Sequence, residues 1–463
     1  MKKYDLVVAG GGPAGITLAK MLGKKKKTAV IRPEAHSMIY CAMPYVLEGL
    51  IDVEKTLKKD ELVTGSGADL IRDTITEIDL KGKKIVLSDS SELMYEKLVI
   101  ATGAVPFIPP IPGTSLKNAT GFKTEMDLKG IQELIATGLK RAVVVGAGAI
   151  GIELSQALRE AGLIVDLVDM GSSVLPNLID REMTDELEAG LIRKGINLHL
   201  NARVTALQGK EWVEQVELDN GGRINFDPID ECSEGGGRAA HDGIVIFAAG
   251  MKPQVDLVKD SGMEIGRDGI VINDKMETSI PDVYAAGDCA QYVSGITGSV
   301  VPGKLATNAV PMAKVLGFNL LGQNRVYRGF YNGAATRVGD FFVGGTGLTE
   351  ASAMAAGYET VSGYSEVTTR FPIMPGAKKM KVKLVADKQT MRILGAQIVS
   401  GEPVTGRIDL ITFAIQNSAA VEDLTALSYS SQPYQSFYPA ANGVVLAAED
   451  ILKKKEQSYA MDR

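Results

Sequence analysis

Two glycine-rich turns are the first candidate binding sites in this sequence, because each has the spacing G-x-G-x-x-G between an apolar run and a helical stretch. The two sets are Gly10, Gly12 and Gly15, and Gly146, Gly148 and Gly151. In such a turn the first glycine permits the tight bend, and the second admits backbone N–H groups close to a pyrophosphate. The third lets the helix pack closely on the strand. One such turn alone is weak evidence, but two in this context predict two dinucleotide sites.

An acidic residue about 20 positions after such a turn typically holds the ribose diol of the dinucleotide. After the second turn this residue is Asp169, which follows the apolar run LIVDLV. The next four residues (170–173) include no Arg or Lys, and a carboxylate repels a 2′-phosphate, so NADH is expected rather than NADPH. After the first turn Arg32 stands at this position and Glu34 follows. Either Glu34 reaches the ribose, or Arg32 pairs with a phosphate or stacks on the adenine.

Cys41 is the candidate nucleophile. It precedes Pro44 in YCAMPYVLEG, and a proline at this place predicts a helix start. The helix macrodipole stabilises a thiolate there, and the thiolate is the form that attacks a disulfide. The alternative is that Cys41 is a small buried apolar residue. With Cys232 and Cys289 the chain has three cysteines, too few for a disulfide scaffold, which favours a reducing, cytoplasmic location.

Two copies of one βαβ unit must position these residues. The order of apolar run, glycine turn, helix and second apolar run begins at Tyr4 and again at Arg141, with Gly10 and Gly146 at equivalent points, 146 − 10 = 136 residues apart. Residues 73–104 alternate as a β-meander followed by a strand. The proline-rich stretch 107–113 predicts a domain boundary, and the polar insert 230–243 predicts an exposed hairpin tip. After about residue 326 the pattern predicts a separate α+β domain.

Composition excludes several classes of protein. The net charge of −6 provides no basic field for nucleic acid or for anionic lipid. There is no run of about 18 apolar residues that could span a membrane. The three histidines are scattered, so no metal site is expected.

The motifs, in this order, resemble the FAD-dependent pyridine nucleotide–disulfide oxidoreductases over essentially the whole chain. TSIPDVYAAGDCA (278–290) resembles the second FAD motif, LVIATGA (98–104) the strand and turn after the meander, and IFAAGMKPQ (246–254) the hinge that returns from the NADH domain. The resemblance implies an α/β fold with two Rossmann-like dinucleotide-binding domains, plus a C-terminal α+β dimerisation domain that makes a homodimer. The implied domains are 1–118 with 251–325 for FAD, 119–250 for NADH, and 326–463 for the interface.

The same resemblance implies the cofactor contacts. Asp288 would bond the ribityl chain of the flavin. The other residues implied for FAD are Gly10, Gly12, Gly15, Glu34, Ile75, Ala101, Thr102 and Gly103, and those implied for NADH and the hinge are Gly146, Gly148, Ile150, Gly151, Asp169 and Gly250.

Cys41 indicates a branch of this family. Members with a cysteine pair have the spacing C-x-x-x-x-C, but the positions five residues away are His36 and Val46. The chain therefore resembles the single-cysteine branch of coenzyme A disulfide reductases, persulfide reductases, NADH oxidases and NADH peroxidases. The peroxidases and many oxidases have a histidine where this chain has Pro13, which favours a sulfur substrate.

A second position bears on the acid that protonates the leaving thiolate. Cysteine-pair members use a His-Pro of the partner subunit, whereas this chain has Gln432-Pro433-Tyr434. Tyr434 resembles a catalytic tyrosine of the coenzyme A disulfide reductases; alternatively it packs at the dimer interface. Ile373-Met374 stand where that branch often has tyrosines, which counts against coenzyme A disulfide itself.

The expected function is therefore that of an NADH-dependent FAD enzyme that reduces a small disulfide, persulfide or polysulfide, with coenzyme A-linked compounds among the candidates. The resemblance implies that hydride passes from NADH to FAD and that the electrons reach a mixed disulfide on Cys41. One alternative is an NADH oxidase in which Cys41 cycles through a sulfenic acid. The other is a redox-sensing flavoprotein in which NADH changes partner binding.

Overall fold

The computed structural model describes residues 2–228 and 241–461 of the chain. The chain forms two compact units. Unit 1 comprises residues 1–107, 123–125 and 250–330, and unit 2 comprises residues 108–122, 126–249 and 331–463. The chain passes from one unit to the other after Phe107, within the proline-rich stretch. The predicted insert at 230–243, with Cys232, lies for the most part outside the described residues.

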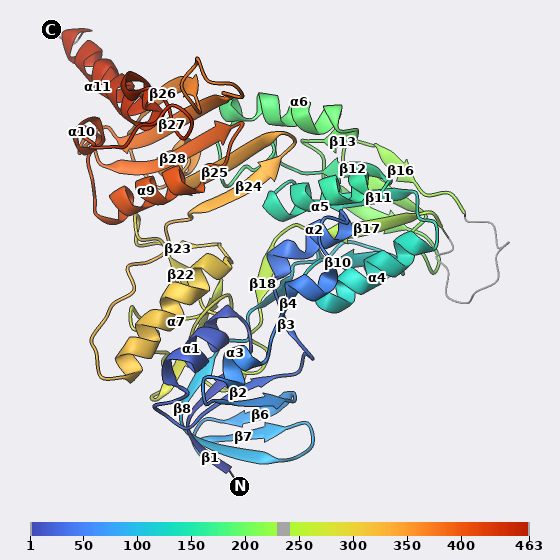
Figure 1. Ribbon diagram of the computed structural model, residues 1–463. Coiled ribbons are helices and arrows are strands. Elements are labelled where there is room, and N and C mark those ends of the chain that lie inside the picture. The colour runs from blue at the N-terminus through green and yellow to red at the C-terminus, as the bar shows by residue number, and fades with distance from the viewer. Residues whose placement is uncertain (1, 229–240, 462–463) are drawn as a thin grey trace. The chain divides into compact units, whose positions relative to one another are not determined.

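Unit 1 contains the first predicted Rossmann-like fold, on a seven-stranded sheet (Figure 1). The strand order is β5-β2-β1-β8-β7-β6, and β21 pairs with the end of β8. The strands β5, β2, β1, β8 and β21 are parallel, whereas β6, β7 and the start of β8 form the predicted antiparallel meander. The strands are β1 (Lys2–Ala9), β2 (Thr28–Arg32), β5 (Asp69–Arg72), β6 (Ile75–Asp79), β7 (Lys84–Leu87), β8 (Glu92–Ile100) and β21 (Val283–Ala285).

Two helices complete the core of unit 1. Helix α1 (Pro13–Leu22) starts at a proline, as a helix readily does, and packs against α7 (Ala306–Leu320). The approach is close, since a Cβ on Gly317 would lie 2.8 Å from the Met21 side chain. The shorter elements are β3 (Ser37–Met38), η1 (Tyr40–Ala42), α2 (Met43–Leu47), η2 (Val53–Thr56), β4 (Leu57–Lys58), α3 (Glu61–Thr64), β9 (Ala104–Pro106), β18 (Met251–Pro253), β19 (Ile265–Gly266), β20 (Gly269–Ile270), β22 (Tyr292–Val293) and β23 (Val300–Val301).

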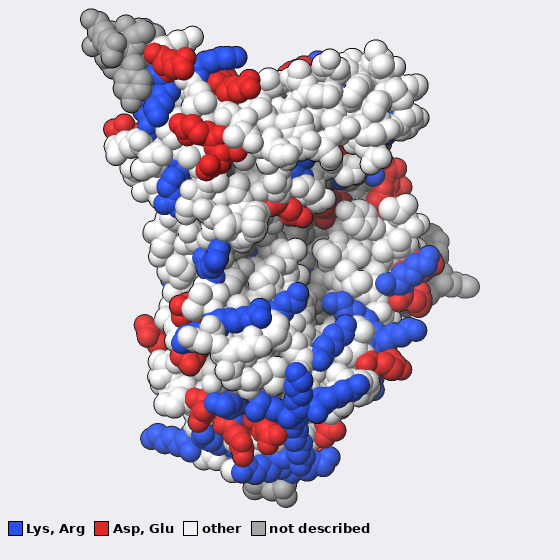
Figure 2. Space-filling model, turned by 60° about the vertical axis from the view of Figure 1, so that its left-hand side comes forward, with Lys and Arg blue, Asp and Glu red and all other residues white. Residues whose placement is uncertain are grey.

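Lys and Arg side chains gather over one end of unit 1, interspersed with carboxylates (Figure 2). At the meander end of the sheet, Asp282 pairs with Lys83 at 2.6 Å and with Lys97 at 2.9 Å. Lys84 pairs with Glu92 at 2.8 Å. Part of the positive charge on this surface is therefore compensated locally.

Unit 2 contains the second predicted Rossmann-like fold. Its parallel sheet has the order β10-β17-β11-β12-β13, and a three-stranded antiparallel sheet, β14-β15-β16, packs beside it. The elements are β10 (Ala119–Gly121), α4 (Glu125–Ala136), β11 (Arg141–Val145), α5 (Ala149–Glu160), β12 (Ile164–Val168), η3 (Arg181–Met183), α6 (Asp185–Arg193), β13 (Ile196–His199), β14 (Val204–Gln208), β15 (Gln215–Leu218), β16 (Arg223–Asn225) and β17 (Gly243–Phe247).

The C-terminal part of unit 2 is a five-stranded antiparallel sheet of order β24-β25-β28-β27-β26, covered by helices (Figure 1). It contacts the second Rossmann-like fold: Thr336 donates to Glu153 at 2.7 Å, and Gln156 donates to the carbonyl of Arg337 at 3.0 Å. The elements are β24 (Ala334–Val338), β25 (Phe341–Gly347), α8 (Glu350–Ala355), β26 (Thr360–Thr368), β27 (Lys379–Asp387), β28 (Ile393–Ser400), α9 (Thr405–Gln416), α10 (Val421–Thr425), η4 (Pro439–Ala441) and α11 (Gly443–Met461). This confirms the predicted α/β class with two Rossmann-like folds and a C-terminal α+β part.

The helices do not meet the requirements of a membrane span. Over residues 2–228 and 241–461, none combines the length and the apolar character that crossing a bilayer requires.

Candidate active site

The first glycine turn joins β1 to α1 in unit 1. Gly10 has φ +130°, and a Cβ on it would lie 2.0 Å from the carbonyl oxygen of Ala101, so only glycine fits. A Cβ on Gly15 would lie 2.1 Å from the carbonyl oxygen of Gly10, which is the close helix–strand approach that the motif requires. Gly12, in contrast, borders open space. The start of α1 is thus open toward a ligand, as an anion site needs.

The other residues expected at the flavin site converge on this turn. Ala101, Thr102 and Gly103 follow β8, and the Thr102 hydroxyl donates to the carbonyl of Gln254 at 2.6 Å. Asp288 follows Gly287, whose Cβ would lie 3.7 Å from that of Ala14 in the first turn of α1. The ends of β1, β8 and β21 therefore bring three distant segments together. Gly250 has φ +115° and accepts from the N–H of Phe107 at 2.9 Å, where the chain re-enters unit 1.

Asp288 is largely buried, with 14% of its side chain exposed. The Tyr292 hydroxyl donates to one carboxylate oxygen at 3.1 Å, and Lys123 Nζ lies 3.9 Å from the other. Burial raises the pKa of Tyr292, and the neighbouring charge of Asp288 raises it further, so this phenol stays a donor. These contacts fix the Asp288 carboxylate beside the start of α1.

Arg32, Glu34 and Ile75 lie around the end of β2. Arg32 is its last residue and is buried, whereas Glu34 is exposed. Ile75 begins β6, close to this point in space, because Asp73 N–H donates to the carbonyl of Arg32 at 3.0 Å. The three expected residues are therefore near one another at the strand end.

The second glycine turn, in unit 2, repeats this geometry between β11 and α5. Gly146 has φ +115°, and a Cβ on Gly151 would lie 1.8 Å from the carbonyl oxygen of Gly146. Gly148 borders open space, and Ile150 exposes 44% of its surface at the start of α5. A second open helix start is thus available to a second dinucleotide.

Asp169 lies at this second turn. One carboxylate oxygen accepts from the N–H of Ala147 at 2.6 Å and the other from the N–H of Gly171 at 2.6 Å. A carboxylate has about four lone-pair positions, so both oxygens retain acceptor capacity for ribose hydroxyls. The side chain is half-buried, and the Met170 side chain beside it is exposed.

Cys41 is exposed and unpaired, in the single 3₁₀ turn η1 directly before α2. Helix α2 has only five residues, so its dipole offers little stabilisation. A second source of positive charge is Lys58 on β4. Burial lowers the pKa of Lys58. The positive charge of Lys20 on α1 lowers this pKa further, whereas the electrostatic interaction with Cys41 raises it. Lys58 is therefore within electrostatic range of Cys41.

Cys289 has a different environment. It is fully buried, and its thiol donates to the carbonyl of Ile100 at 3.3 Å. Burial raises its pKa, so it stays a neutral thiol. Of the two cysteines that the structure describes, only Cys41 can act as a nucleophile.

Tyr434 is exposed by 55% in a loop of unit 2. The side-chain oxygen of Gln432 accepts from the N–H of Tyr434 at 2.9 Å, so the glutamine that replaces the histidine holds the loop. The Arg370 guanidinium lies 5.0 Å from the centre of the Tyr434 ring and also pairs with Glu402 at 2.6 Å. The backbone of Tyr434 is thus held by Gln432, and its ring lies beside Arg370.

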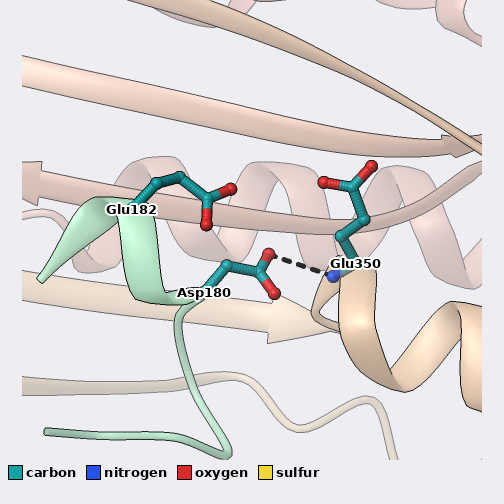
Figure 3. Close-up of side chains that lie close together, drawn as sticks. All are labelled: Asp180, Glu182 and Glu350. Carbon is teal, nitrogen blue, oxygen red and sulfur yellow. Dashed lines mark hydrogen bonds between the residues drawn. The ribbon is translucent and has the colours of Figure 1, made fainter. Parts of the chain in front are cut away.

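Asp180, Glu182 and Glu350 form the one acidic group with metal-ligand spacing among the described residues, with one ligand atom from each within 4.8 Å of the others (Figure 3). The buried ammonium of Lys383 lies among them, 2.8 Å from Asp180 and 2.8 Å from Glu350, and it also bonds to Glu182. A cationic side chain thus already lies within the group and offsets part of its negative charge, and the contacts join the segment around η3 of the second Rossmann-like fold to α8 and β27.

The residues present fit two dinucleotides. Each turn has an open helix start, a glycine where the helix packs too closely on the strand for a side chain, and a nearby carboxylate. In unit 1 there is also an unsatisfied buried donor, Nε of Arg32. This fold with these turns defines a protein that binds two dinucleotides.

Comparison with known proteins gives the family. The model of the pyridine nucleotide-disulphide oxidoreductases matches residues 4–313, and the model of their dimerisation domain matches residues 334–438. The chain belongs to this family and is an oxidoreductase that uses FAD and NADH.

Relatives match along almost the full length. An NADH oxidase of Methanocaldococcus jannaschii is 34% identical, over 97% of this chain and 98% of its own. An NAD(P)H coenzyme A polysulfide/persulfide reductase of Pyrococcus horikoshii is 33% identical, over 92% and 95%.

Solved structures agree with this. An NAD-dependent persulfide reductase of A. fulgidus is 30% identical and has a TM-score of 0.89, covering 98% of this chain and 83% of that one. An engineered water-forming NADPH oxidase, a variant of a Lactobacillus brevis NADH oxidase, is 26% identical with a TM-score of 0.89, covering 99% and 100%.

Sequence reasoning missed Lys58, Arg370 and Lys383. Nothing in their residue types or spacing marks them, because each is placed by strand register or by a loop contact. Lys58, for example, is placed by the pairing of β4 with β3, in which Lys58 lies opposite Ser37.

Proposed function

We propose that this protein is an NADH-dependent flavoprotein reductase of a small disulfide, persulfide or polysulfide, with Cys41 as its redox cysteine. The observation that carries the proposal is an exposed, unpaired Cys41 in the unit that holds the flavin turn, whereas Cys289, the other cysteine that the structure describes, is fully buried. An exposed thiol is accessible to a substrate disulfide, and its thiolate is the attacking form.

The chemistry at Cys41 follows from thiol–disulfide exchange. The thiolate attacks one sulfur of the substrate, a new S–S bond forms to Cys41, and the other sulfur leaves as a thiolate or hydrosulfide. Tyr434, contributed by a partner subunit, donates a proton to that leaving group. Two electrons and one proton then cleave the mixed disulfide, releasing the reduced product and restoring the Cys41 thiolate. FAD, when bound, supplies the two-electron chemistry that links NADH to this step.

The cofactor residues are proposed in the roles given above. We assign residues 1–118 and 251–325 to FAD, 119–250 to NADH and 326–463 to the subunit interface. Asp288 binds the ribityl chain, Asp169 binds the NADH ribose, and the two glycine turns bind the pyrophosphates. Ile75 and residues 101–103 line the flavin site, Ile150 lies beside the nicotinamide nucleotide, and Gly250 provides the hinge.

A homodimer is part of this proposal. The matched dimerisation domain supports it, as do apolar side chains on the surface of the C-terminal part. Phe413 on α9 is 66% exposed and Ile373 is 84% exposed, and a subunit interface would cover such side chains. The cysteine content supports a cytoplasmic location.

The substrate is proposed to be anionic. Lys58 is within electrostatic range of Cys41, so a negatively charged sulfur compound fits this surface better than a cationic one. A coenzyme A-linked persulfide or disulfide meets this condition, and the Pyrococcus relative is named for such substrates. The rival substrate is oxygen, because the Methanocaldococcus relative is named an NADH oxidase. Pro13 favours sulfur over oxygen, because proline at this place cannot transfer protons.

The purified protein should be yellow, with about one FAD per chain. Turnover with a panel of electron acceptors should then separate the candidate functions. We expect anaerobic NADH consumption with coenzyme A persulfide, polysulfide or a small disulfide to exceed aerobic consumption without them by at least about tenfold. Faster turnover with oxygen alone would establish the oxidase instead. Flavin reduction by NADH without turnover on any acceptor would leave the redox-sensing role.

The preference for NADH should be at least about tenfold in kcat/KM, because phosphate repulsion and a lost ribose bond together exceed about 1.4 kcal/mol. The engineered Lactobacillus brevis enzyme supports this. Its substitutions fall at a Gly, an Asp, the two residues after the Asp, and a Pro, at the same intervals as Gly151, Asp169, Met170, Gly171 and Pro176 here.

The matching test is the double variant Asp169→Ala/Met170→Arg, which should prefer NADPH. Asp169→Ala alone should weaken both cofactors, since Asp169 also bonds to the N–H groups of Ala147 and Gly171. Equal kcat/KM values of the unaltered protein for NADH and NADPH would show that Asp169 does not contact the ribose.

A further inference from the structure

Arg32 stands where a carboxylate typically ends the second strand of a dinucleotide-binding fold. Its side chain is only 4% exposed and lies against the glycine turn. A Cβ on Gly11 would be 2.6 Å from Cδ of Arg32, so the stem of the arginine crosses the turn itself. A buried cation is therefore part of the first dinucleotide site.

The guanidinium is held in one orientation by one of its terminal nitrogens. Nη2 donates to the carbonyl of Ala35 at 3.0 Å and to Asp60 at 2.5 Å, and Asp60 also pairs with Arg72. Burial lowers the pKa of Arg32, and the charge of Arg72 lowers it further, whereas Glu34 and Tyr40 act in the opposite sense. An additional negative group beside Arg32 would stabilise its charge.

Nε of Arg32 is buried and, among the residues that the structure describes, has no hydrogen-bond partner. Leaving such a donor unsatisfied is unfavourable, and a ligand that accepts from it removes that penalty. Nε is bonded directly to Cδ, the atom that lies over Gly11, so the free donor is beside the turn. The N–H groups of that turn and the start of α1 favour an anion at the same place.

We propose that Nε of Arg32 donates a hydrogen bond to the pyrophosphate of FAD, with Asp60 as the residue that orients the guanidinium. This rests on the proposed function insofar as unit 1 holds FAD. In the usual dinucleotide-binding fold a carboxylate at the end of the second strand contacts the ribose. Here the residue at the end of β2 would contact a phosphate instead. It also gives Asp60 a role. The hydrogen bond from Nη2 to Asp60 fixes the orientation of the guanidinium, so that Nε–H is already oriented when the ligand binds.

The test is to measure the dissociation constant of FAD. The holoenzyme is diluted at several salt concentrations, and the rise in flavin fluorescence reports the FAD that is released. Arg32→Met should raise the FAD dissociation constant by about 10- to 100-fold and flatten its salt dependence, because a charged phosphate contact is lost. Arg32→Lys keeps a cation that can pair with Asp60 but lacks Nε–H, and should still raise the constant by about tenfold. Arg72→Met removes the exposed partner of Asp60 and should change it less than about threefold.

The outcomes are distinguishable. If the unaltered protein holds no FAD, the proposed function fails. If it holds FAD and Arg32→Lys holds it equally well, the assignment of Nε is wrong. If Arg32→Met loses FAD with an unchanged salt dependence, the contact is not to phosphate, and the proposal is overturned. Should Arg32→Met fail to fold, as judged by circular dichroism, the lysine variant alone decides.

Discussion

Replacing Cys41 by serine should lower anaerobic turnover with any disulfide, persulfide or polysulfide by at least about a hundredfold, the scale of loss when a nucleophile is removed. A serine hydroxyl hardly ionises at neutral pH and cannot carry a mixed disulfide. FAD should remain bound, and NADH should still bleach it, because the substitution leaves both glycine turns, Asp169 and Asp288 intact. The measurement is NADH consumption without oxygen, expressed per bound FAD.

The matched control is Cys289→Ala. Cys289 is fully buried and its pKa is raised by burial, so it takes no part in the exchange chemistry, and its variant should keep sulfur turnover within a few-fold. Sulfur reduction by Cys41→Ser at near the original rate would mean that Cys41 only packs. Loss of activity in both variants alike would point to damage to the flavin site rather than to a missing nucleophile.

Lys383→Met should lower the free energy of unfolding of unit 2 by about 3–5 kcal/mol, the usual cost of removing one partner of a buried ionic group. The Lys383 side chain is 0% exposed and that of Asp180 is 7% exposed, so methionine would leave Asp180 charged in an apolar interior. Glu182 and Glu350 are more exposed and can take up water. The single tryptophan, Trp212, lies in unit 2, so its fluorescence in a urea titration reports on that unit.

Lys381→Met is the matched control, two residues away on the same strand. Lys381 pairs with Glu186 at 3.1 Å on the surface, and both side chains are partly exposed, so the loss should be below about 1 kcal/mol. Equal effects of the two substitutions would show that the buried group contributes no more than a surface pair.

The stability of Lys383→Met should also depend on pH, because of Asp180 and Glu182. Burial raises the pKa of each, but hydrogen bonds led by that from Lys383 outweigh it, and both pKa values end below the ordinary range. A depressed pKa stabilises the fold above the ordinary carboxyl pKa of about 4, and this contribution is lost as pH falls through the folded value. Without Lys383 the strongest of the hydrogen bonds that lower the two pKa values is lost, while burial still raises both. The stability difference between Lys383→Met and the unaltered protein should therefore narrow below about pH 4.

The local signals in the sequence predict the fold well. Gly10 and Gly146 mark the two turns because strand, glycine and helix follow one another within a short stretch, so the repeat predicts both Rossmann-like folds. Asp169 is found in the same way, by its distance from the turn. The start of the helix after Cys41 was also predicted, but its length of five residues was not.

Contacts between distant segments could not be predicted from this one sequence. Lys383 and Asp180 are 203 residues apart, and their bond depends on how the C-terminal sheet packs on the second Rossmann-like fold. Arg32 was recognised as a departure from the usual acidic residue. Its partner Asp60 and its unsatisfied Nε become visible only when α3 and β5 are placed beside β2.

The discontinuity of unit 1 constrains the order in which a ribosome can complete it. The chain leaves this unit after Phe107 and returns at Gly250, where β9 and β18 pair and place Pro106 opposite Met251. Strand β21, which lies beside β8, and Asp288 are made only after the return. At about 5–20 residues per second the intervening segment takes roughly 7 to 30 s to synthesise. During that interval the end of β8 lacks its partner β21, and the nascent chain contains Cys41 but not yet Asp288.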